Sequence, residues 1–205
     1  MRPPVAVLDY GVGNLHSATK ALDRAGADVR VVATVEAAAG AAALVVPGVG
    51  AYGACLAGLG RAGGPKAVAA WIEQGRPLLG ICVGMQLVFE GSDEGPVRDG
   101  IGALPGTVRR LPDIVKVPHI GWNTVTVRPG SRLFAGLPDG TRFYFVHSYA
   151  PEAADPAVTA VCDYGRPFAA AVERDNLFGS QFHPEKSGTS GLTLLTNFVN
   201  EAKRA

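Results

Sequence analysis

One cysteine stands in a setting that suits covalent chemistry. Cys82 lies in the segment Gly80-Ile81-Cys82-Val83-Gly84, which has the form Gly-x-nucleophile-x-Gly. In such an elbow the chain turns sharply from a strand into a helix, and glycine fits best beside the nucleophile. The turn exposes the sulfur at the carboxyl edge of a sheet, where the N-terminus of the helix favours the thiolate. The segment predicts a nucleophilic thiol. The alternative is a buried structural cysteine, which we assign to Cys55 and Cys162.

A nucleophilic thiol needs a base, and one of the four histidines has a suitable neighbour. His183 is followed by Pro184 and Glu185, after a segment typical of a strand. If the extended geometry continues through Pro184, the side chains of His183 and Glu185 point to the same side. The carboxylate would then orient the imidazole and stabilise its protonated form, whereas the alternative is a surface turn with a solvated glutamate. Cys82, His183 and Glu185 are therefore the candidate catalytic residues.

The first half of the chain alternates short apolar runs with helical periodicity. Four apolar runs predict buried parallel strands, at residues 5–8, 29–32, 43–46 and 78–81. Helical spacing occurs at residues 15–25, 67–74 and 85–89, and Asn14 can cap the first of these helices. This order predicts an α/β fold with an open, mostly parallel sheet flanked by helices on both faces.

The pattern changes after Gly91. Residues 106–182 hold short strand-like segments separated by turns, which we interpret as antiparallel additions to the same sheet. These segments are residues 107–111, 124–127, 143–146, 158–161, 168–172 and 177–181. A closing helix has an apolar face made by Leu192, Leu195, Phe198 and Val199. Since no linker rich in serine or proline divides the chain, we expect a single domain over residues 1–205.

Composition excludes several classes of protein. With 47% hydrophobic and 18% charged residues, the chain is neither intrinsically disordered nor a coiled coil. A net charge of +1, with no basic run longer than Arg109-Arg110, argues against nucleic-acid binding. The apolar runs are far shorter than the ~20 residues of a membrane span, and the chain starts without the apolar run of a signal peptide. We therefore expect a cytoplasmic protein that binds no membrane.

Metal and cofactor sites are not indicated. The three cysteines lack CxxC spacing, and His119 and His147 do not form an HxxxH pair, so we interpret both histidines as structural. Residues 48–53 fit the pattern GxGxxG, but they follow the third predicted strand instead of the first. The next strand also lacks the acidic residue that a dinucleotide site needs. We therefore expect neither a metal nor a cofactor.

Several motifs together resemble those of a known family. The elbow extended to Met85-Gln86, with Phe182-His183-Pro184-Glu185, resembles the triad-type (class I) glutamine amidotransferases. Further blocks resemble one branch of that family, the glutaminase subunits of imidazole glycerol phosphate synthases: residues 9–14, 47–51, 117–123, 144–149 and 183–187. The resemblance covers essentially the whole chain. It implies a flavodoxin-like fold and hydrolysis of glutamine to glutamate and ammonia through a thioester on Cys82.

The resemblance also implies roles for residues around Cys82. The amide of Val83 and, after a peptide reorientation, the amide of Val49 would hold the oxyanion. Glycine at positions Gly48 and Gly50 would make that reorientation sterically easy. Four further positions would bind the glutamine substrate: Gln86, Glu94, Ser148 and Tyr149. Of these, Glu94 suits the α-ammonium group, although an ordinary polar loop is the alternative.

A partner subunit is the last implication of the resemblance. Ammonia released into water at neutral pH would be protonated, and this family delivers it across a sealed interface to a (βα)₈-barrel cyclase in a heterodimer. The cyclase activates the glutaminase and uses the ammonia to make imidazole glycerol phosphate and an aminoimidazole carboxamide ribotide. Asn14, Trp122, Asn123 and Lys186 match positions near that interface. The alternatives are a helix cap for Asn14, a core position for Trp122 and a solvated charge for Lys186.

Three other functions are compatible with the sequence. They are an amidotransferase that serves a different synthase, a stand-alone cysteine hydrolase or peptidase, and a non-catalytic scaffold. Residues 117–123 argue against the first function, and a partner-specific binding assay would decide it. The second predicts full activity without a partner, and the intact Cys82, His183 and Glu185 argue against the third.

Overall fold

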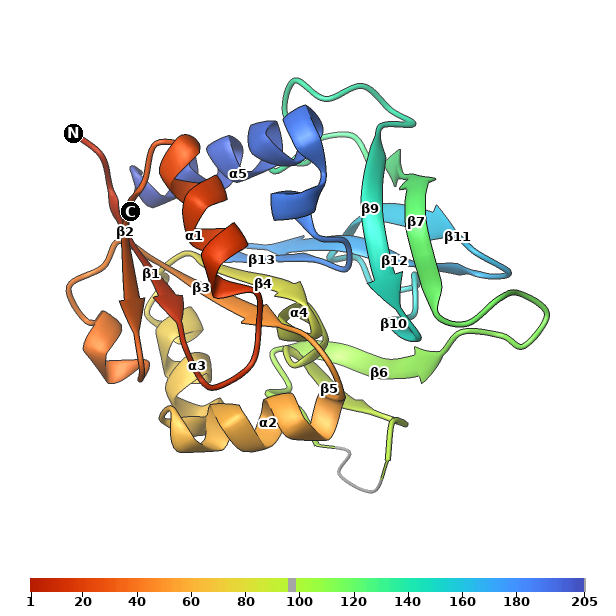
Figure 1. The fold of residues 1–205 in the computed structure, drawn as a ribbon, viewed down its shortest axis with the longest axis horizontal. Coiled ribbons are helices and arrows are strands. Elements are labelled where there is room, and N and C mark those ends of the chain that lie inside the picture. Colours follow the sequence, from red (N-terminus) through yellow and green to blue (C-terminus); the bar gives the residue numbers. More distant parts are fainter. Residues whose placement is uncertain (96–98, 205) are drawn as a thin grey trace.

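A central eight-stranded sheet organises the computed structural model, which describes residues 1–95 and 99–204 (Figure 1). The strand order is β2-β1-β3-β4-β13-β12-β11-β8. In chain order these strands are β1 (Pro4–Leu8), β2 (Asp28–Val32), β3 (Ala43–Gly48), β4 (Leu78–Cys82), β8 (Thr126–Val127), β11 (Val158–Asp163), β12 (Pro167–Arg174) and β13 (Leu177–Ser180). The pairs from β2 to β13 are parallel, and β12, β11 and β8 follow antiparallel. The predicted mixed, mostly parallel sheet is confirmed.

β13 belongs to the parallel part of the sheet, so the expectation that residues 177–181 are an antiparallel addition is wrong for the pairing with β4. It pairs parallel with β4 and antiparallel with β12. Hydrophobic pattern alone identifies a buried strand but carries no information on the direction of its neighbours. Because β3, β4 and β13 run in the same direction, their carboxyl ends meet at one edge of the sheet. Gly48, Cys82 and the residues that follow Ser180 are therefore brought together there.

Two smaller sheets stand beside the central one. β5 (Phe89–Ser92), β6 (Leu104–Arg110) and β10 (Tyr149–Pro151) form a three-stranded sheet. β7 (His119–Thr124) and β9 (Arg142–His147) form an antiparallel pair. The expectation that all late strands extend the central sheet is therefore wrong for these segments. In β9 buried residues alternate with less buried ones, as in a ribbon that packs only one face on the core.

Helices cover both faces of the central sheet. The helices are α1 (Leu15–Arg24), α2 (Tyr52–Arg61), α3 (Gly64–Glu73), α4 (Val83–Gln86) and α5 (Gly188–Ala202). α1 and α5 lie over one face, and α2 and α3 lie over the other (Figure 1). The predicted cap is present, because the Asn14 side chain accepts a hydrogen bond from the Ser17 amide. No helix among the described residues is both long enough and apolar enough to cross a membrane.

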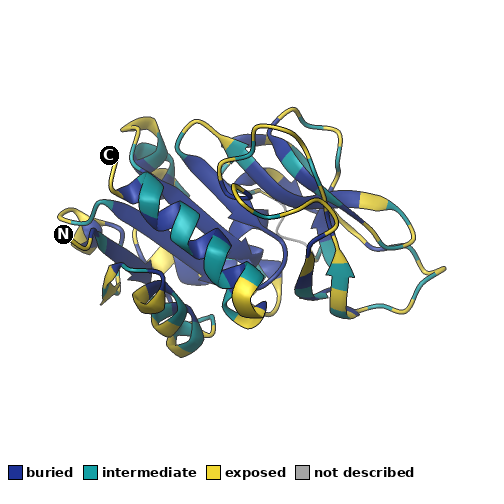
Figure 2. Ribbon diagram, turned by 90° about the horizontal axis from the view of Figure 1, so that it is seen from above, coloured by how far each residue is buried: buried dark blue, intermediate teal, exposed yellow. Residues whose placement is uncertain are grey.

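α2 was not predicted, and its glycines explain why. Gly53, Gly58 and Gly60 give its sequence the composition of a loop. Gly58 is required by packing, because a Cβ at this position would lie 2.6 Å from the carbonyl oxygen of Tyr10. Buried residues concentrate in the central sheet and on the helix faces turned toward it (Figure 2). The single domain expected over residues 1–205 stays a prediction.

Candidate active site

Cys82 occupies a sharp elbow at the carboxyl end of β4. Its backbone has φ 55° and ψ −113°, a conformation that residues other than glycine rarely adopt. Close backbone contacts require the flanking glycines. A Cβ on Gly84 would lie 1.9 Å from the carbonyl oxygen of Val46, and one on Gly80 would lie 2.7 Å from the backbone of Gly84. The predicted elbow is therefore present. The α4 helix behind it has only four residues, so its dipole favours a thiolate less than a longer helix would.

His183 and Glu185 meet through a tight turn. β13 ends at Ser180, and a 3₁₀ helix follows over Pro184–Lys186. This turn brings Glu185 Oε1 within 2.7 Å of His183 Nδ1, and the two side chains are only 3% and 2% exposed. The predicted pairing exists, but the extended geometry expected through Pro184 is wrong. The proline begins the 3₁₀ turn, where its fixed φ and missing N–H are tolerated.

The turn is attached to β9 through its backbone. The His183 amide donates to the carbonyl of Tyr144 at 2.9 Å. The Ser187 hydroxyl donates to the carbonyl of His183 at 2.7 Å and accepts from the Tyr144 amide at 3.0 Å. Ser187 is itself 1% exposed. These hydrogen bonds fix the backbone of His183 and so help to hold its imidazole in place. A group that moves protons during catalysis requires such a fixed position.

The surroundings of His183 favour its protonated form. Burial alone would lower the pKa of His183, but Cys82 and Glu185 raise the pKa by a larger amount. Its Nε2 atom is buried and has no hydrogen-bond partner among the described residues. Because His183 and Cys82 line one cavity, this nitrogen is available to a group bound there. A protonated imidazole beside a thiol is the arrangement that activates cysteine nucleophiles.

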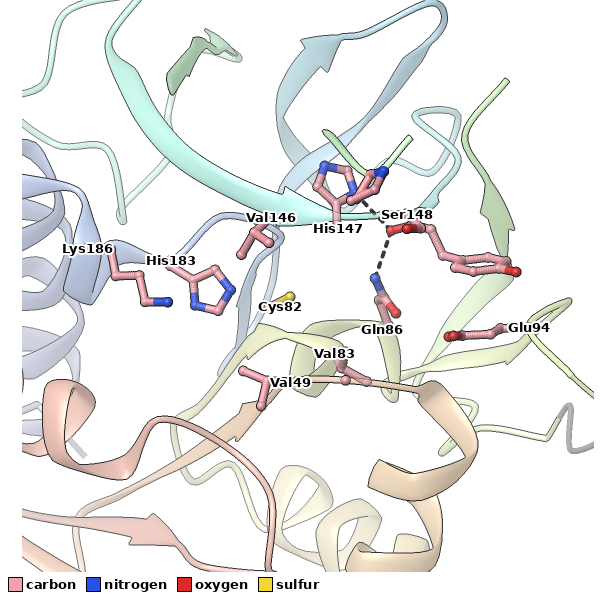
Figure 3. A pocket seen from close by; sticks show the side chains of 13 residues that line it. Val49, Cys82, Val83, Gln86, Glu94, Val146, His147, Ser148, His183 and Lys186 are labelled. Carbon is pink, nitrogen blue, oxygen red and sulfur yellow. Dashed lines mark hydrogen bonds between the residues drawn. The ribbon is translucent and has the colours of Figure 1, made fainter. Parts of the chain in front are cut away.

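A cavity of about 350 Å³ contains Cys82 and His183 (Figure 3). Small-molecule sites have volumes of roughly 300–1,000 Å³. The predicted site residues that line the cavity are Val49, Gly50, Cys82, Val83, Gln86, Glu94, Ser148, Tyr149, His183 and Lys186. Gly48 and Glu185 lie behind it and line a second, small cavity together with Asn14. The structure thus assembles residues from β3, β4, β10 and the turn after β13 around one sulfur.

The end of β3 approaches the elbow closely. Gly48 is the register partner of Cys82, and a Cβ on Gly48 would lie 2.5 Å from the amide nitrogen of Gly84. Gly50 has φ 84°, a conformation that favours glycine. Between them, Val49 is 36% exposed, and its carbonyl accepts a hydrogen bond from Cys55 Sγ at 3.3 Å. The oxyanion roles of Val49 and Val83 stay predictions.

Two of the predicted glutamine-binding residues have partners in the protein itself. Gln86 is 2% exposed, and its Nε2 donates to the carbonyl of Tyr149 at 2.9 Å. Glu94 accepts a hydrogen bond from the Tyr52 amide at 3.0 Å and so caps α2, whose N-cap residue Ala51 offers no side-chain acceptor. Glu94 therefore has a structural contact at the cavity wall, in addition to the substrate contact predicted for it.

The predicted interface residues lie on separate elements. Asn14 caps α1, which agrees with its alternative interpretation, and it is exposed. Trp122 on β7 is 48% exposed, which excludes the core position. Asn123 lies on the same strand and is partly buried. Lys186 is exposed at the end of the 3₁₀ turn and lines the cavity. Their interface roles stay predictions.

Two buried polar residues contact the site without having been assigned a role in it. Gln181 Nε2 donates to Cys82 Sγ at 3.6 Å. His147, interpreted as structural, lines the cavity, and its Nδ1 lies 2.9 Å from the carbonyl of Tyr149. For Gln181 a signal existed in the sequence, since an uncharged polar residue follows a run with the pattern of a buried strand.

Comparisons with known proteins agree with this arrangement. The family model described as glutamine amidotransferase class-I matches residues 6–202. The chain is 52% identical over 209 residues to imidazole glycerol phosphate synthase subunit HisH of Nocardia farcinica, covering 97% of this chain and 98% of the relative. The corresponding subunit of Moorella thermoacetica is 49% identical over 205 residues, covering 98% of this chain and 97% of the relative.

Solved structures with the same fold are more distant in sequence. The structure of PurLQS from Thermotoga maritima matches with a TM-score of 0.77 and 22% identity, covering 98% of this chain and 99% of that one. The glutaminase domain of CTPS from Trypanosoma brucei matches with a TM-score of 0.72 and 16% identity, covering 98% of this chain and 94% of that one. At these identities the two matches establish the fold alone, and they confirm the predicted fold class.

Proposed function

The chain belongs to the class I glutamine amidotransferase family, and we propose that it is the glutaminase subunit of an imidazole glycerol phosphate synthase, with Cys82, His183 and Glu185 as its catalytic triad. One observation carries the proposal. The chain is 49–52% identical, over nearly its whole length, to curated subunits of that enzyme. The shared cavity of Cys82 and His183 supports the assignment of the triad.

In the first half of the reaction, the Cys82 thiolate attacks the side-chain amide carbon of glutamine. A carbon–sulfur bond forms, and the carbonyl oxygen becomes an oxyanion that the amides of Val83 and Val49 stabilise. Protonated His183 then gives its proton to the amide nitrogen as the carbon–nitrogen bond breaks. The products are ammonia and a glutamyl thioester on Cys82. Glu185 holds the imidazole in place and stabilises its charge, in agreement with the 2.7 Å contact at Nδ1.

In the second half, His183 acts as a base. It takes a proton from a water molecule that attacks the thioester carbon. The carbon–sulfur bond breaks, glutamate leaves, and the Cys82 thiolate and the protonated imidazole are restored. The α-ammonium group of glutamine would lie near Glu94, and Gln86, Ser148 and Tyr149 would hold the remainder of the amino-acid end. All four line the cavity beside Cys82.

The ammonia would pass to a cyclase subunit. The relatives are subunits of a synthase. We infer a heterodimer with a (βα)₈-barrel cyclase that converts a ribonucleotide to imidazole glycerol phosphate and an aminoimidazole carboxamide ribotide. Asn14, Trp122, Asn123 and Lys186 are the residues proposed for this interface. The apolar Ile120 and Trp122, which are 59% and 48% exposed, support a protein contact on β7. We also propose that the protein is cytoplasmic.

The test is glutamate release from glutamine by the purified chain, with and without the cyclase and its nucleotide ligand. We expect strong stimulation that saturates at one cyclase per chain. Full activity that the cyclase does not change would retain the chemistry of Cys82 but replace the synthase subunit with an independent amidase. Unchanged activity after Cys82→Ser would contradict every covalent form of the proposal.

A further inference from the structure

A series of buried and partly buried hydrogen bonds joins strand β7 to the sulfur of Cys82. We propose that Gln181, Gln86 and the His119–His147 pair are positioning residues, which fix the sulfur and the cavity wall at Tyr149 and connect both to β7. This inference rests on the proposed function, in which Cys82 is the nucleophile. It gives a role to His119 and His147, which were predicted to be structural, and to Gln181, for which no role was predicted.

The links nearest the sulfur are two glutamine side chains. Gln181 is 0% exposed, its Nε2 donates to Cys82 Sγ at 3.6 Å, and its Oε1 accepts from Gln86 Nε2 at 3.0 Å. Gln86 Nε2 also donates to the carbonyl of Tyr149 at 2.9 Å (Figure 3). An N–H group directed at sulfur stabilises the thiolate more than the thiol, because a charged acceptor makes the stronger hydrogen bond. Gln181 therefore favours the reactive form of Cys82.

The next links are two histidines whose tautomers follow from their partners. His147 Nδ1 lies 2.9 Å from the carbonyl of Tyr149, and a carbonyl only accepts, so Nδ1 carries the proton. Burial lowers the pKa of His147 to about 3, which leaves the ring neutral and its Nε2 an acceptor. His119 Nδ1, at 3.0 Å from that nitrogen, must then donate. Both rings are therefore neutral and carry their proton on Nδ1.

The far end of the chain of hydrogen bonds is Asn123 on β7. Its Nδ2 lies 3.4 Å from His119 Nε2, which is the remaining acceptor of that ring. Its Oδ1 accepts from the Thr124 amide at 2.8 Å, so the orientation of the side-chain amide is fixed. The His119 ring is also held by stacking, with centroids 3.9 Å from Tyr164 and 5.0 Å from Phe145. Each link from Asn123 to Cys82 thus has a defined direction.

β7 presents its two faces to different surroundings. His119 is 3% exposed and turns toward the cavity wall, whereas Ile120 and Trp122 are 59% and 48% exposed. A protein that docks on the exposed face must contact the strand that carries Asn123 and His119. Displacement of β7 would move the Tyr149 carbonyl and, through Gln86 and Gln181, the N–H directed at Cys82 Sγ. The hydrogen-bond chain is therefore a physical route from the proposed interface to the nucleophile.

The tautomers can be tested without any assay of function. Nitrogen NMR of the purified chain labelled with ¹⁵N-histidine would give the protonation of each ring nitrogen between pH 5 and 8. We expect His119 and His147 to stay neutral, with the proton on Nδ1, because burial lowers the pKa of His119 to about 4 and that of His147 to about 3. The nitrogen signals are assigned to each histidine by their loss in the variants His119→Asn and His147→Gln. A proton on Nε2 of either ring in place of Nδ1 would contradict the proposed donor and acceptor roles of His119 and His147.

The effect on Cys82 can be measured by alkylation. The rate at which iodoacetamide labels Cys82 at neutral pH reports its thiolate fraction, with Cys82→Ser subtracted as the blank. We expect Gln181→Leu to slow labelling about tenfold, because one hydrogen bond to a charged group is lost. His119→Phe preserves the stacking but removes the Nδ1–H donor and the Nε2 acceptor, and we expect it to slow labelling about threefold, since it acts through further links.

Two variants control this experiment. His119→Asn places an N–H group where Nδ1 lies, and we expect it to restore labelling to near the wild-type rate. Tyr164→Phe keeps the ring stacked on His119 and loses only the hydroxyl that donates to the carbonyl of Lys116, so it should label like wild type. Wild-type labelling in Gln181→Leu and His119→Phe, or no recovery in His119→Asn, would overturn the proposal. A wild-type chain that releases no glutamate even with the cyclase and its nucleotide ligand would instead contradict the proposed function, and the nitrogen shifts would still decide the tautomers.

Discussion

Gly84 and Val46 touch backbone to backbone beneath the nucleophile. A Cβ on Gly84 would lie 1.9 Å from the carbonyl oxygen of Val46, which neither backbone can avoid without moving. The contact packs α4 directly against β3, so the elbow at Cys82 and the strand end at Gly48 lie side by side. The proposed oxyanion site depends on the relative position of the elbow and this strand end. That position is possible only because Gly84 has no side chain.

We therefore expect Gly84→Ala to damage both stability and activity. Forcing a methyl group into this contact costs about 3 kcal/mol of unfolding free energy and shifts the elbow, so glutaminase activity is lost. Denaturant unfolding and glutamate release measure the two effects. Gly53→Ala is the matched control, because Gly53 lies in α2 and a methyl group added there would meet no atom within 4 Å. That variant should be as stable as wild type or more stable by about 0.5–1 kcal/mol. Equal stability of the two variants would contradict the contact.

Replacing Glu185 tests the pair at His183. Glu185→Gln keeps the shape of the side chain but removes the charge that raises the pKa of His183. We expect kcat for glutamine hydrolysis to fall up to about 10⁴-fold, which is the loss found when the acid of a Ser-His-Asp triad is made neutral. KM should change little, because Glu185 lies behind the cavity. A change confined to KM would place Glu185 in substrate binding instead.

Glu94 has two contacts that two substitutions can separate. Glu94→Gln keeps an oxygen that can accept the hydrogen bond from the Tyr52 amide but loses the charge proposed to meet the α-ammonium group. We expect KM for glutamine to rise about tenfold with stability within about 0.5 kcal/mol of wild type. Glu94→Ala should raise KM similarly and also cost about 1 kcal/mol, because α2 loses its cap. If Glu94→Gln leaves KM unchanged, Glu94 is only a helix cap.

Stability should depend on pH through the buried histidine at the cavity wall. Burial lowers the pKa of His147 from 6.5 to about 3, so between these values the unfolded chain binds a proton that the folded chain does not. The contribution of the neutral ring to the free energy of unfolding is therefore fully present above pH 6.5 and is lost as the pH falls below that value. We expect about 2 kcal/mol to be lost on this account between pH 6.5 and 4.5. Denaturant midpoints should show a shallower pH dependence in His147→Gln, and an identical slope would contradict the neutral, buried ring.

Much of the fold follows from local sequence patterns. Apolar runs located β1, β3 and β4, and the glycines around Cys82 located the elbow, because both signals depend on neighbouring residues alone. The partners of strands depend on distant residues, so the parallel pairing of β13 and the separate β7–β9 ribbon could not be predicted. The predicted contact between Glu185 and His183 is present, but a 3₁₀ turn that begins at Pro184 produces it instead of the expected extended segment.

The candidate site divides in the same way. Residues with a distinctive spacing, such as Cys82 and His183, could be selected from the sequence. For Gln181 the sequence holds only a weak signal, an uncharged polar residue after an apolar run, and for His147 it holds none. The contacts of both residues depend on where the folded chain directs a single N–H group. Glu94 was selected for its charge, but its contact with α2 depends on a helix that the sequence analysis did not predict.

The central claim is that Cys82 carries the glutamyl group during the reaction. The most direct measurement is rapid acid quenching of the cyclase-bound chain after mixing with glutamine, followed by mass spectrometry of the peptide that contains Cys82. The account predicts a glutamyl adduct on that cysteine within one turnover, and none in Cys82→Ser, which should also release no ammonia. Ammonia release without an adduct, at a rate that Cys82→Ser leaves unchanged, would contradict it.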